Sequence, residues 1–340
     1  MIYARRSLAK VAAISVVVAI TATSCNPSRQ TNSNVPSSSE PVPVDVSMRL
    51  PIPVADTAFA PYYLCIDAGI CEKHGINLTL EPGSPELNPV KMLSQGTDEF
   101  ALVGGPEILL TARSQDAPIV GISLIGKDAN FVTILTPEDS DIRELNDLQD
   151  KKVGFFYGHI STDVLRMLFE KENIQVQEVD VGFDYSQLIA GNLDAQWAFR
   201  TTAGITLPAR GVNVASIDPA DYGISTQGFV LMTNENLLSD DPELVQSFVN
   251  AITESVQYSL ENEQEAIDST VRRDPEFSQE VGEAQLDIYR TSIENQSRVG
   301  FFEPSDMEKT KDQMLLVDLI PDDLSLEDAY TNQFVENSQE

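Results

Sequence analysis

The side chains best suited to bind a small molecule lie in four short segments that combine small residues with aromatic or hydrogen-bonding groups. The segments are residues 51–63 (PIPVADTAFAPYY), 103–107 (VGGPE), 157–162 (YGHIST) and 196–202 (QWAFRTT). Four of their residues offer rings that could stack on a planar ligand or pack in a core: Phe59, Tyr62, Tyr157 and Trp197. Arg200 could donate two parallel hydrogen bonds to a carboxylate, sulfonate or phosphate. The pattern favours binding of a small polar or planar molecule.

Catalytic signatures are absent from the same sequence. It holds two histidines, His74 and His159, and no GxSxG, Walker, HExxH, paired CxxC or GxGxxG motif. With 53 acidic residues, chance pairs of carboxylates are expected and carry little information. We therefore predict a protein that is not an enzyme and that uses no cofactor and no metal.

The elements that must position the four segments follow an alternating strand and helix pattern, which is typical of α/β folds. Strands are predicted at 46–51, 76–80, 99–103, 120–124, 131–135, 152–156, 175–181, 195–199 and 228–233. Helices are predicted at 61–68, 89–94, 108–113, 161–172, 185–190 and 241–260. The pattern restarts at 152, which indicates two lobes: 45–133 plus 233–335, and 134–232. Crossing strands between them are placed at 131–137 and 228–234.

The N-terminus has the layout of a secretory signal. Arg5, Arg6 and Lys10 precede an apolar run at 11–21, which is too short to span a bilayer, and small residues follow up to Cys25. We predict a signal peptide at 1–24 and a lipid on Cys25, with cleavage nearby and a free cysteine as the alternative. Residues 25–44 are rich in Ser, Pro and Asn and are predicted to form a disordered tether.

The net charge and the cysteines of the chain limit its possible partners and indicate a possible disulfide. The net charge of −31 argues against nucleic acid as a partner, because phosphates demand a basic face. Cys65 and Cys71 are six residues apart, so outside the cytoplasm they could form a disulfide; the sequence leaves both the bonded and the reduced state open.

Several longer stretches resemble one family of binding proteins. They are APYYLCIDAGICEKHGINLTL, ELNDLQDKKVGF, VGFDYSQLIAGNLDAQWA, GFVLMTNENLLSDDPELVQSFVNAI and FFEPSDMEKTKDQMLLVDLI with DAYTNQFV. Together they are similar to the NMT1/THI5-like solute-binding proteins of ABC transporters, over most of residues 45–335. The first turn departs from the pyrimidine-precursor binders, which tend to carry a Trp-Phe-Pro-Asn type segment where this chain has PIPVADTAF. The CCCFC motif of the family's pyrimidine synthases is absent.

The resemblance implies a fold, a site and a set of partners. The expected fold is α/β, a two-lobed periplasmic-binding-protein type II (venus-flytrap) body with crossing hinge strands. The expected ligand-binding residues are Pro53, Asp56, Phe59, Tyr62, Gly104, Gly105, Glu107, Tyr157, His159, Ser161, Thr162, Trp197 and Arg200. The expected partners are a small-molecule ligand, an ABC permease and, through the lipid, a membrane of the cell envelope outside the cytoplasm.

The resemblance leaves the ligand class open. A thiamine-pyrimidine precursor or a related heterocycle is the leading expectation. The alternatives are an alkanesulfonate-like, taurine-like or nitrate-like anion, and an enzyme of pyrimidine precursors on the same scaffold.

Overall fold

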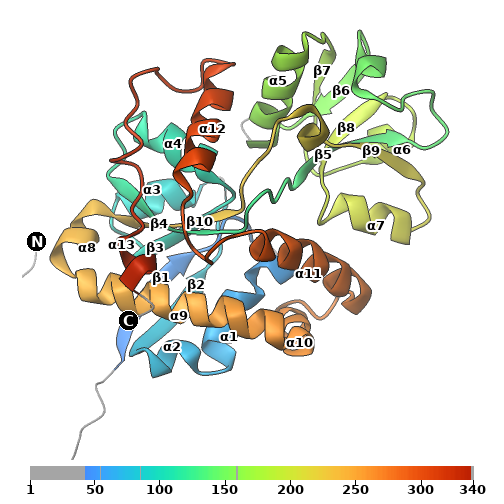
Figure 1. Ribbon diagram of the computed structural model, residues 1–340. Coiled ribbons are helices and arrows are strands. Elements are labelled where there is room, and N and C mark those ends of the chain that lie inside the picture. Colours follow the sequence, from blue (N-terminus) through green and yellow to red (C-terminus); the bar gives the residue numbers. More distant parts are fainter. Residues whose placement is uncertain (1–42, 54, 85, 158–159, 338–340) are drawn as a thin grey trace, which may run out of the picture. The chain divides into compact units, whose positions relative to one another are not determined.

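The computed structural model describes residues 43–53, 55–84, 86–157 and 160–337 (Figure 1). The predicted signal peptide, Cys25 and His159 lie outside these described residues, as does the predicted tether up to residue 42. Among the helices that are described, none is both long enough and apolar enough to cross a bilayer.

Two five-stranded sheets organise the described chain, as Figure 1 shows. In spatial order the first sheet holds β2 (Ile76–Glu81), β1 (Val44–Arg49), β3 (Phe100–Val103), β10 (Phe229–Asn234) and β4 (Ile119–Ile125). The second holds β7 (Gln177–Asp180), β6 (Lys152–Phe155), β8 (Ala195–Phe199), β5 (Val132–Pro137) and β9 (Val214–Ile217). We call residues 43–125 and 229–337, which build the first sheet and its helices, lobe 1. Residues 132–222, which build the second, are lobe 2.

Lobe 1 carries most of the helices. They are η1 (Thr57–Phe59), α1 (Ala60–Asp67), α2 (Ile70–Lys73), α3 (Pro89–Ser94), α4 (Pro106–Arg113), α8 (Glu235–Asp240), α9 (Pro242–Glu261), α10 (Glu263–Arg273), α11 (Gln279–Glu294), α12 (Pro304–Leu315) and α13 (Gln333–Glu336). Lobe 2 has η2 (Leu145–Leu148), α5 (Ile160–Glu172), α6 (Ser186–Ile189), α7 (Ala203–Ala209) and η3 (Pro219–Tyr222).

The sequence explains how α9 forms and what it covers. The Asp241 carboxylate accepts a hydrogen bond from the Leu244 N–H at the start of α9, and Pro242 occupies the first turn. Apolar residues then recur at helical spacing, so one stripe of the helix is buried. Phe248 of this stripe stacks on Phe100 of β3, with ring centroids 3.8 Å apart. The helix therefore holds the core of lobe 1 against its sheet.

The two connections between the lobes run side by side. We call residues 126–131 and 223–228 the crossing segments. The Gly228 N–H donates to the Gly126 carbonyl at 2.8 Å, and the Asn130 N–H donates to the Thr226 carbonyl at 3.2 Å. A Cβ at Gly228 would lie 2.0 Å from the Ile125 carbonyl oxygen, so this close approach requires glycine.

The crossing segments correct part of the sequence prediction. Crossing strands were expected at 131–137 and 228–234, and the lobe boundaries at 133 and 232. In the structure most of these residues form β5 and β10, which belong to the interiors of the two sheets, and the chain crosses just before each strand. The reason is that β10 pairs antiparallel with both β3 and β4 and is therefore an integral strand of lobe 1.

The cysteine pair is bonded. Cys65 in α1 and Cys71 in α2 form a disulfide with Cα atoms 4.9 Å apart. Gly69, between the two helices, has a φ of 71°, in the left-handed region that glycine favours, and this turn brings the cysteines together. The open question of the sequence is settled in favour of the disulfide.

Candidate functional site

The candidate site lies where the carboxyl ends of the parallel strands of the two sheets meet the crossing segments. In lobe 1, β1, β2 and β3 run parallel, and in lobe 2, β6, β7 and β8 do. Ligands of α/β proteins bind outside the carboxyl ends of such strands. Three of the four segments predicted from the sequence begin at or after the ends of β1, β3 and β6, and the fourth, 196–202, includes the last four residues of β8 and the loop after it. We call this region the interlobe boundary.

Asp56 is the centre of a buried hydrogen-bond network in the β1–α1 loop. Its carboxylate accepts hydrogen bonds from the Ala58 N–H at 2.8 Å and the Tyr289 hydroxyl at 3.1 Å. Gln285 donates to the same carboxylate at 3.3 Å. Burial raises the pKa of Asp56, and these hydrogen bonds oppose that rise. Asp56 thus orders the loop and joins it to α11.

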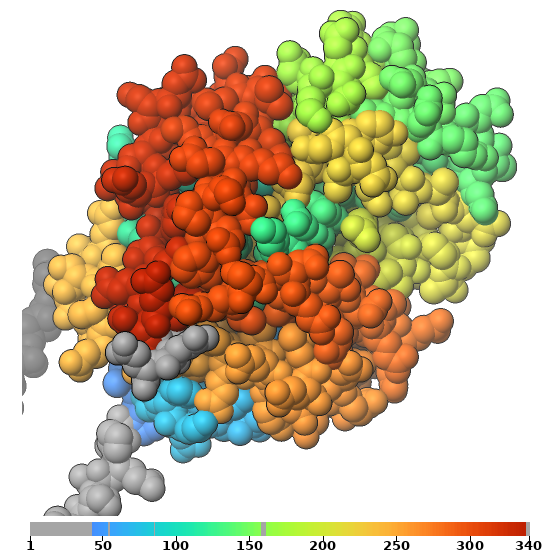
Figure 2. All heavy atoms as spheres, viewed as in Figure 1, coloured from blue at the N-terminus to red at the C-terminus, as the bar shows by residue number. Residues whose placement is uncertain are grey.

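Gln285 extends this network across the boundary. Its amide oxygen accepts from the Thr57 hydroxyl at 2.8 Å, and its amide nitrogen donates to the Thr201 carbonyl of lobe 2 at 2.7 Å. Figure 2 shows the orange helix α11 lying directly against the yellow-green atoms of lobe 2. One buried side chain of lobe 1 therefore holds the loop after β8, next to Arg200.

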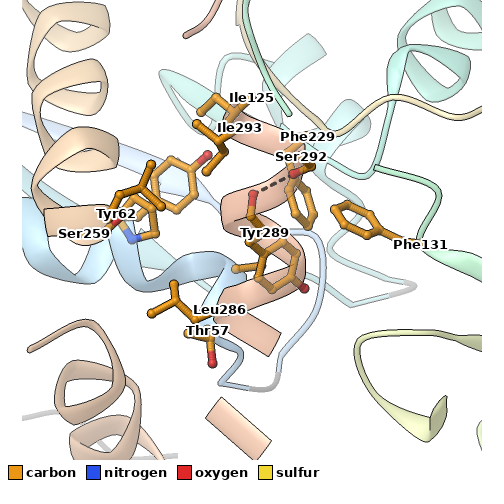
Figure 3. A pocket seen from close by; sticks show the side chains of 13 residues that line it. Thr57, Tyr62, Ile125, Phe131, Phe229, Ser259, Leu286, Tyr289, Ser292 and Ile293 are labelled. Carbon is orange, nitrogen blue, oxygen red and sulfur yellow. Dashed lines mark hydrogen bonds between the residues drawn. The ribbon is translucent and has the colours of Figure 1, made fainter. Parts of the chain in front are cut away.

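An apolar crevice lies beside this network, between lobe 1 residues and the first crossing segment (Figure 3). Its lining includes Tyr62, Phe131, Phe229 and Tyr289. Phe131 is the last residue of the first crossing segment, and Phe229 directly follows the second. The Phe131 ring meets the Tyr289 ring edge-on, with centroids 5.2 Å apart. The crevice therefore links the core of lobe 1 to the point where the chain crosses.

Glu107 is a buried carboxyl at the start of α4. Its side chain is 2 % exposed, and its Oε1 has no hydrogen-bond partner among the described residues. Burial raises the pKa of Glu107 to about 7, and the nearby carboxylate of Asp163, at the start of α5 in lobe 2, adds to the rise. The carboxyl lies in front of Gly105, because a Cβ built at Gly105 would be 2.4 Å from Glu107 Oε2.

Four aromatic rings gather at the carboxyl ends of the lobe 2 strands. Trp197, in the middle of β8, is fully buried and stacks on Phe156, with centroids 5.6 Å apart and planes 20° apart. Phe183 and Phe199 meet the Trp197 ring edge-on, each with a centroid distance of 5.3 Å. The Phe183 ring is 54 % exposed. The group, Phe156, Phe183, Trp197 and Phe199, is called the aromatic cluster below.

Tyr157 and Arg200, two further polar residues of the boundary, differ in their interactions. Tyr157 is 46 % exposed and lies under the Arg166 guanidinium, and a hydrogen bond to Glu178 raises its pKa. Arg200 is half-buried; its guanidinium lies 3.5 Å from the Asn130 carbonyl oxygen. Among the described residues Arg200 makes no salt bridge.

The structure therefore separates the predicted site residues into groups. Asp56 belongs to the buried network, and Phe59 and Tyr62 lie in the core of lobe 1, where Phe59 meets Phe229 edge-on. Gly104, Gly105 and Glu107 lie together at the end of β3. Ser161 and Thr162 are buried in the first turn of α5, and the Thr162 hydroxyl donates to the Phe156 carbonyl at 2.6 Å. Pro53 is exposed in the β1–α1 loop.

Sequence reasoning missed several residues of the boundary. Gln285 and Tyr289 lie in the helical C-terminal half, where nothing in their spacing connects them with Asp56, more than 200 positions earlier. Phe183 lies in the β7–α6 loop, within VGFDYSQLIAGNLDAQWA, and its aromatic type was the one available signal. Asp163 looks like an ordinary acidic residue in the first turn of a helix.

Comparison with known proteins finds a matching family and two relatives that are named as binding proteins. The family described as NMT1/THI5 like matches residues 56–266. A formylaminopyrimidine-binding protein of Halalkalibacterium halodurans is 26% identical over 244 residues, which is 68% of this chain and 73% of that protein. The riboflavin-binding protein RibY of Chloroflexus aurantiacus is 22% identical over 299 residues, 83% of this chain and 84% of that protein.

One relative is named as an enzyme, and the solved structures show the fold. The 4-amino-5-hydroxymethyl-2-methylpyrimidine phosphate synthase of Aspergillus parasiticus is 23% identical over 259 residues, 70% of this chain and 75% of that protein. The periplasmic aliphatic sulphonate binding protein SsuA of Escherichia coli has a TM-score of 0.67 at 16% identity, over 84% of this chain and 92% of that one. The expected two-lobed fold is thereby confirmed.

Proposed function

Because the chain belongs to the NMT1/THI5-like family, we propose that it is the extracytoplasmic solute-binding protein of an ABC importer. In this proposal a thiamine-pyrimidine precursor or a related heterocycle binds at the interlobe boundary and is delivered to a membrane permease. The two crossing segments, which pair with each other in antiparallel fashion, would supply the hinge that closure about a ligand requires.

The aromatic cluster is the observation that carries the proposed ligand class. Its rings are packed against one another by three close contacts around Trp197, so they are held rigidly, and Phe183 leaves half of its surface accessible. Stacking on a preorganised aromatic group favours flat ligands. The names of two relatives, a pyrimidine binder and a riboflavin binder, also refer to planar heterocycles.

A second ligand class is favoured by one residue. Arg200 is a half-buried cation without a salt bridge among the described residues, in a chain with 53 acidic and 22 basic residues. Such a guanidinium suits an alkanesulfonate or a similar anion. We rank this class second because the carboxyls of Glu107 and Asp163 at the same boundary repel anions.

An enzyme on this scaffold is the third alternative. The name of the fungal relative is its support, whereas the other two relatives are named as binding proteins. Incubation of the purified protein with a pyrimidine precursor, followed by mass spectrometry, distinguishes an enzyme from a binding protein. A binding protein returns the compound chemically unchanged.

We further propose that a lipid on Cys25 tethers the folded body to a membrane, within reach of its permease. Support comes from the charged, apolar and small segments before Cys25 and from the polar stretch after it. Mass spectrometry of the N-terminal peptide from the membrane fraction tests the tether. An unmodified Cys25, or cleavage beyond it, would remove this part of the proposal and leave the binding function untouched.

A thermal-shift panel tests the binding function. The panel contains a formylaminopyrimidine, riboflavin, an alkanesulfonate and nitrate. Since a ligand at 100 times its Kd adds about 2.7 kcal/mol of stability, the melting temperature should rise by roughly 5–10 °C with one class. We expect a pyrimidine or a flavin to produce that rise. Absence of a shift with every member would contradict the proposed ligand classes.

A further inference from the structure

We infer that Glu107 of lobe 1 and Asp163 of lobe 2 form a carboxyl pair that recognises a cationic or multiply donating edge of the ligand, such as the amino-substituted edge of an aminopyrimidine. The inference rests on the proposed function and deepens it. It assigns the ligand a chemical class and gives the two carboxyls the role of selecting against simple anions.

Glu107 is buried with one carboxyl oxygen unpaired among the described residues. A carboxyl that is 2 % exposed normally has its oxygens hydrogen-bonded, because burying an unpaired polar atom costs about 1–3 kcal/mol. Its Oε1 nevertheless lacks a partner among the residues that the structure describes. A buried oxygen without a hydrogen-bond partner at a candidate site is suited to accept a hydrogen bond from an N–H or O–H group of the ligand.

The Glu107 carboxyl lies at the end of a parallel strand of lobe 1. Glu107 follows Gly104 and Gly105 at the carboxyl end of β3, and its Oε2 occupies the space in front of Gly105. That space also borders the second crossing segment, since a Cβ at Gly105 would lie 3.9 Å from the Gly228 carbonyl oxygen. The carboxyl therefore lies at the interlobe boundary, beside the segment through which the chain crosses.

Lobe 2 contributes a second carboxyl near Glu107. Asp163 lies in the first turn of α5, seven residues after Phe156 of the aromatic cluster. It is half-buried, and no hydrogen bond or salt bridge of its side chain is present in the described part of the chain. The Arg166 guanidinium attracts the Asp163 carboxylate, but Arg166 is itself paired with Glu178. Its carboxylate is near enough to Glu107 for the two to repel each other. A ligand with positive charge or several N–H donors relieves that repulsion, whereas an anion increases it.

The two features together describe a single ligand. The aromatic cluster offers a stacking surface on Phe183, and the carboxyl pair offers hydrogen-bond acceptors at the same interlobe boundary. A planar ring with an exocyclic amino group satisfies both at once. A sulfonate or nitrate satisfies neither.

A matched pair of ligands tests this inference. The two probes are 4-amino-5-hydroxymethyl-2-methylpyrimidine and 5-hydroxymethyl-2-methylpyrimidine, which differ by one amino group. Calorimetric titrations would use the whole mature chain and the variants Glu107→Gln and Asp163→Asn. Glu254→Gln is the matched control, because Glu254 forms an exposed pair with Lys73 on α2.

We expect Glu107→Gln and Asp163→Asn each to weaken binding of the amino compound about 10- to 100-fold, as loss of a hydrogen bond to a charged group does. Binding of the deamino compound should change less than about threefold in the same variants. Equal weakening of both compounds, or no weakening of the amino compound, overturns the inference alone. The inference is also overturned if the unmodified protein binds an alkanesulfonate and the Glu107→Gln variant binds it with the same affinity. If the unmodified protein binds none of these compounds, nor riboflavin or nitrate, the proposed function itself fails.

Discussion

At the scale of single residues, the buried carboxyl of Glu107 ties the candidate site to the pH dependence of stability. Its pKa is about 7 in the folded chain, against 4.5 as the ordinary value. Below pH 4.5 both the folded and the unfolded chain keep the proton, so the group costs nothing. Between 4.5 and 7 the unfolded chain loses the proton first, so the free energy of unfolding falls as pH rises. Above pH 7 the cost is complete.

Replacement of Glu107 by glutamine removes this cost. We expect Glu107→Gln to raise the free energy of unfolding at pH 8 by up to roughly 3 kcal/mol, and to change it by less than about 1 kcal/mol at pH 4. Urea unfolding at the two pH values measures the difference. A variant that is equally or less stable than the unmodified protein at pH 8 would contradict the burial of an ionisable carboxyl at this position.

Gly105 offers a way to move the same carboxyl without removing it. An alanine Cβ would lie 2.4 Å from Glu107 Oε2, so the carboxyl must shift, and the far end of a side chain can do so at small cost. We expect Gly105→Ala to weaken binding of an aminopyrimidine about tenfold while lowering stability by less than about 1 kcal/mol. Gly104→Ala is the control, because the nearest atom to its Cβ would be 4.0 Å away. Equal effects of the two substitutions on affinity would count against Glu107 as a ligand contact.

Residue type and position indicated Glu107 and Arg200 from the sequence, because each follows a predicted strand, and Trp197, which lies within one. The sequence did not distinguish Phe59, whose ring is buried in lobe 1, from Trp197, whose ring lies in the aromatic cluster. Both are aromatic residues beside a turn, and only the path of the chain decides which ring faces the boundary. Gln285 could not be found at all, because its partners are contributed by loops distant in sequence.

At the scale of elements, the disulfide fixes the turn between α1 and α2. Cys65 and Cys71 close a short loop, and both are buried. Removal of a crosslink of this size should lower the free energy of unfolding by about 2 kcal/mol.

We expect the double variant Cys65→Ser with Cys71→Ser to unfold at a correspondingly lower denaturant concentration. Its unfolding midpoint should no longer change when a reducing agent is added. The unmodified protein, reduced with dithiothreitol before unfolding, is the comparison. An unmodified protein whose unfolding midpoint is insensitive to reduction would contradict a stabilising role for the disulfide.

Elements with a strong periodic pattern were predictable nearly to the residue. The predicted helix at 89–94 and strand at 195–199 coincide with α3 and β8. β9 was missed because its four residues, VASI, are mostly half-buried or exposed and show little of an apolar pattern. α7 was missed for a different reason: it is seven residues long and contains Pro208, which a helix pattern does not accommodate.

At the scale of the whole molecule, the two lobes communicate through a few described contacts. Two crossing segments pair with each other, and Gln285 joins α11 to the loop after β8. The Phe199 side chain packs against the cores of both lobes. A ligand held by the aromatic cluster on one side and by Glu107 on the other would add to these contacts, which is how its binding would favour a closed arrangement.

The two-lobed organisation was predictable because the strand and helix pattern restarts at 152 and the chain returns to lobe 1 near 229. The exact crossing points were not. Residues 131–135 and 228–233 read equally well as crossing strands or as interior strands of a sheet, since both are apolar. Pairing with distant partners, β10 with β3 and β4, decides between them.

The central claim is that this protein carries one planar nitrogen heterocycle at the interlobe boundary. Its most direct test is mass spectrometry of the small molecules released by denaturing protein that was isolated from its native envelope. We predict one compound at about one equivalent per chain, with an aromatic ring and an amino or amide edge. An alkanesulfonate or another simple anion in its place would contradict the account.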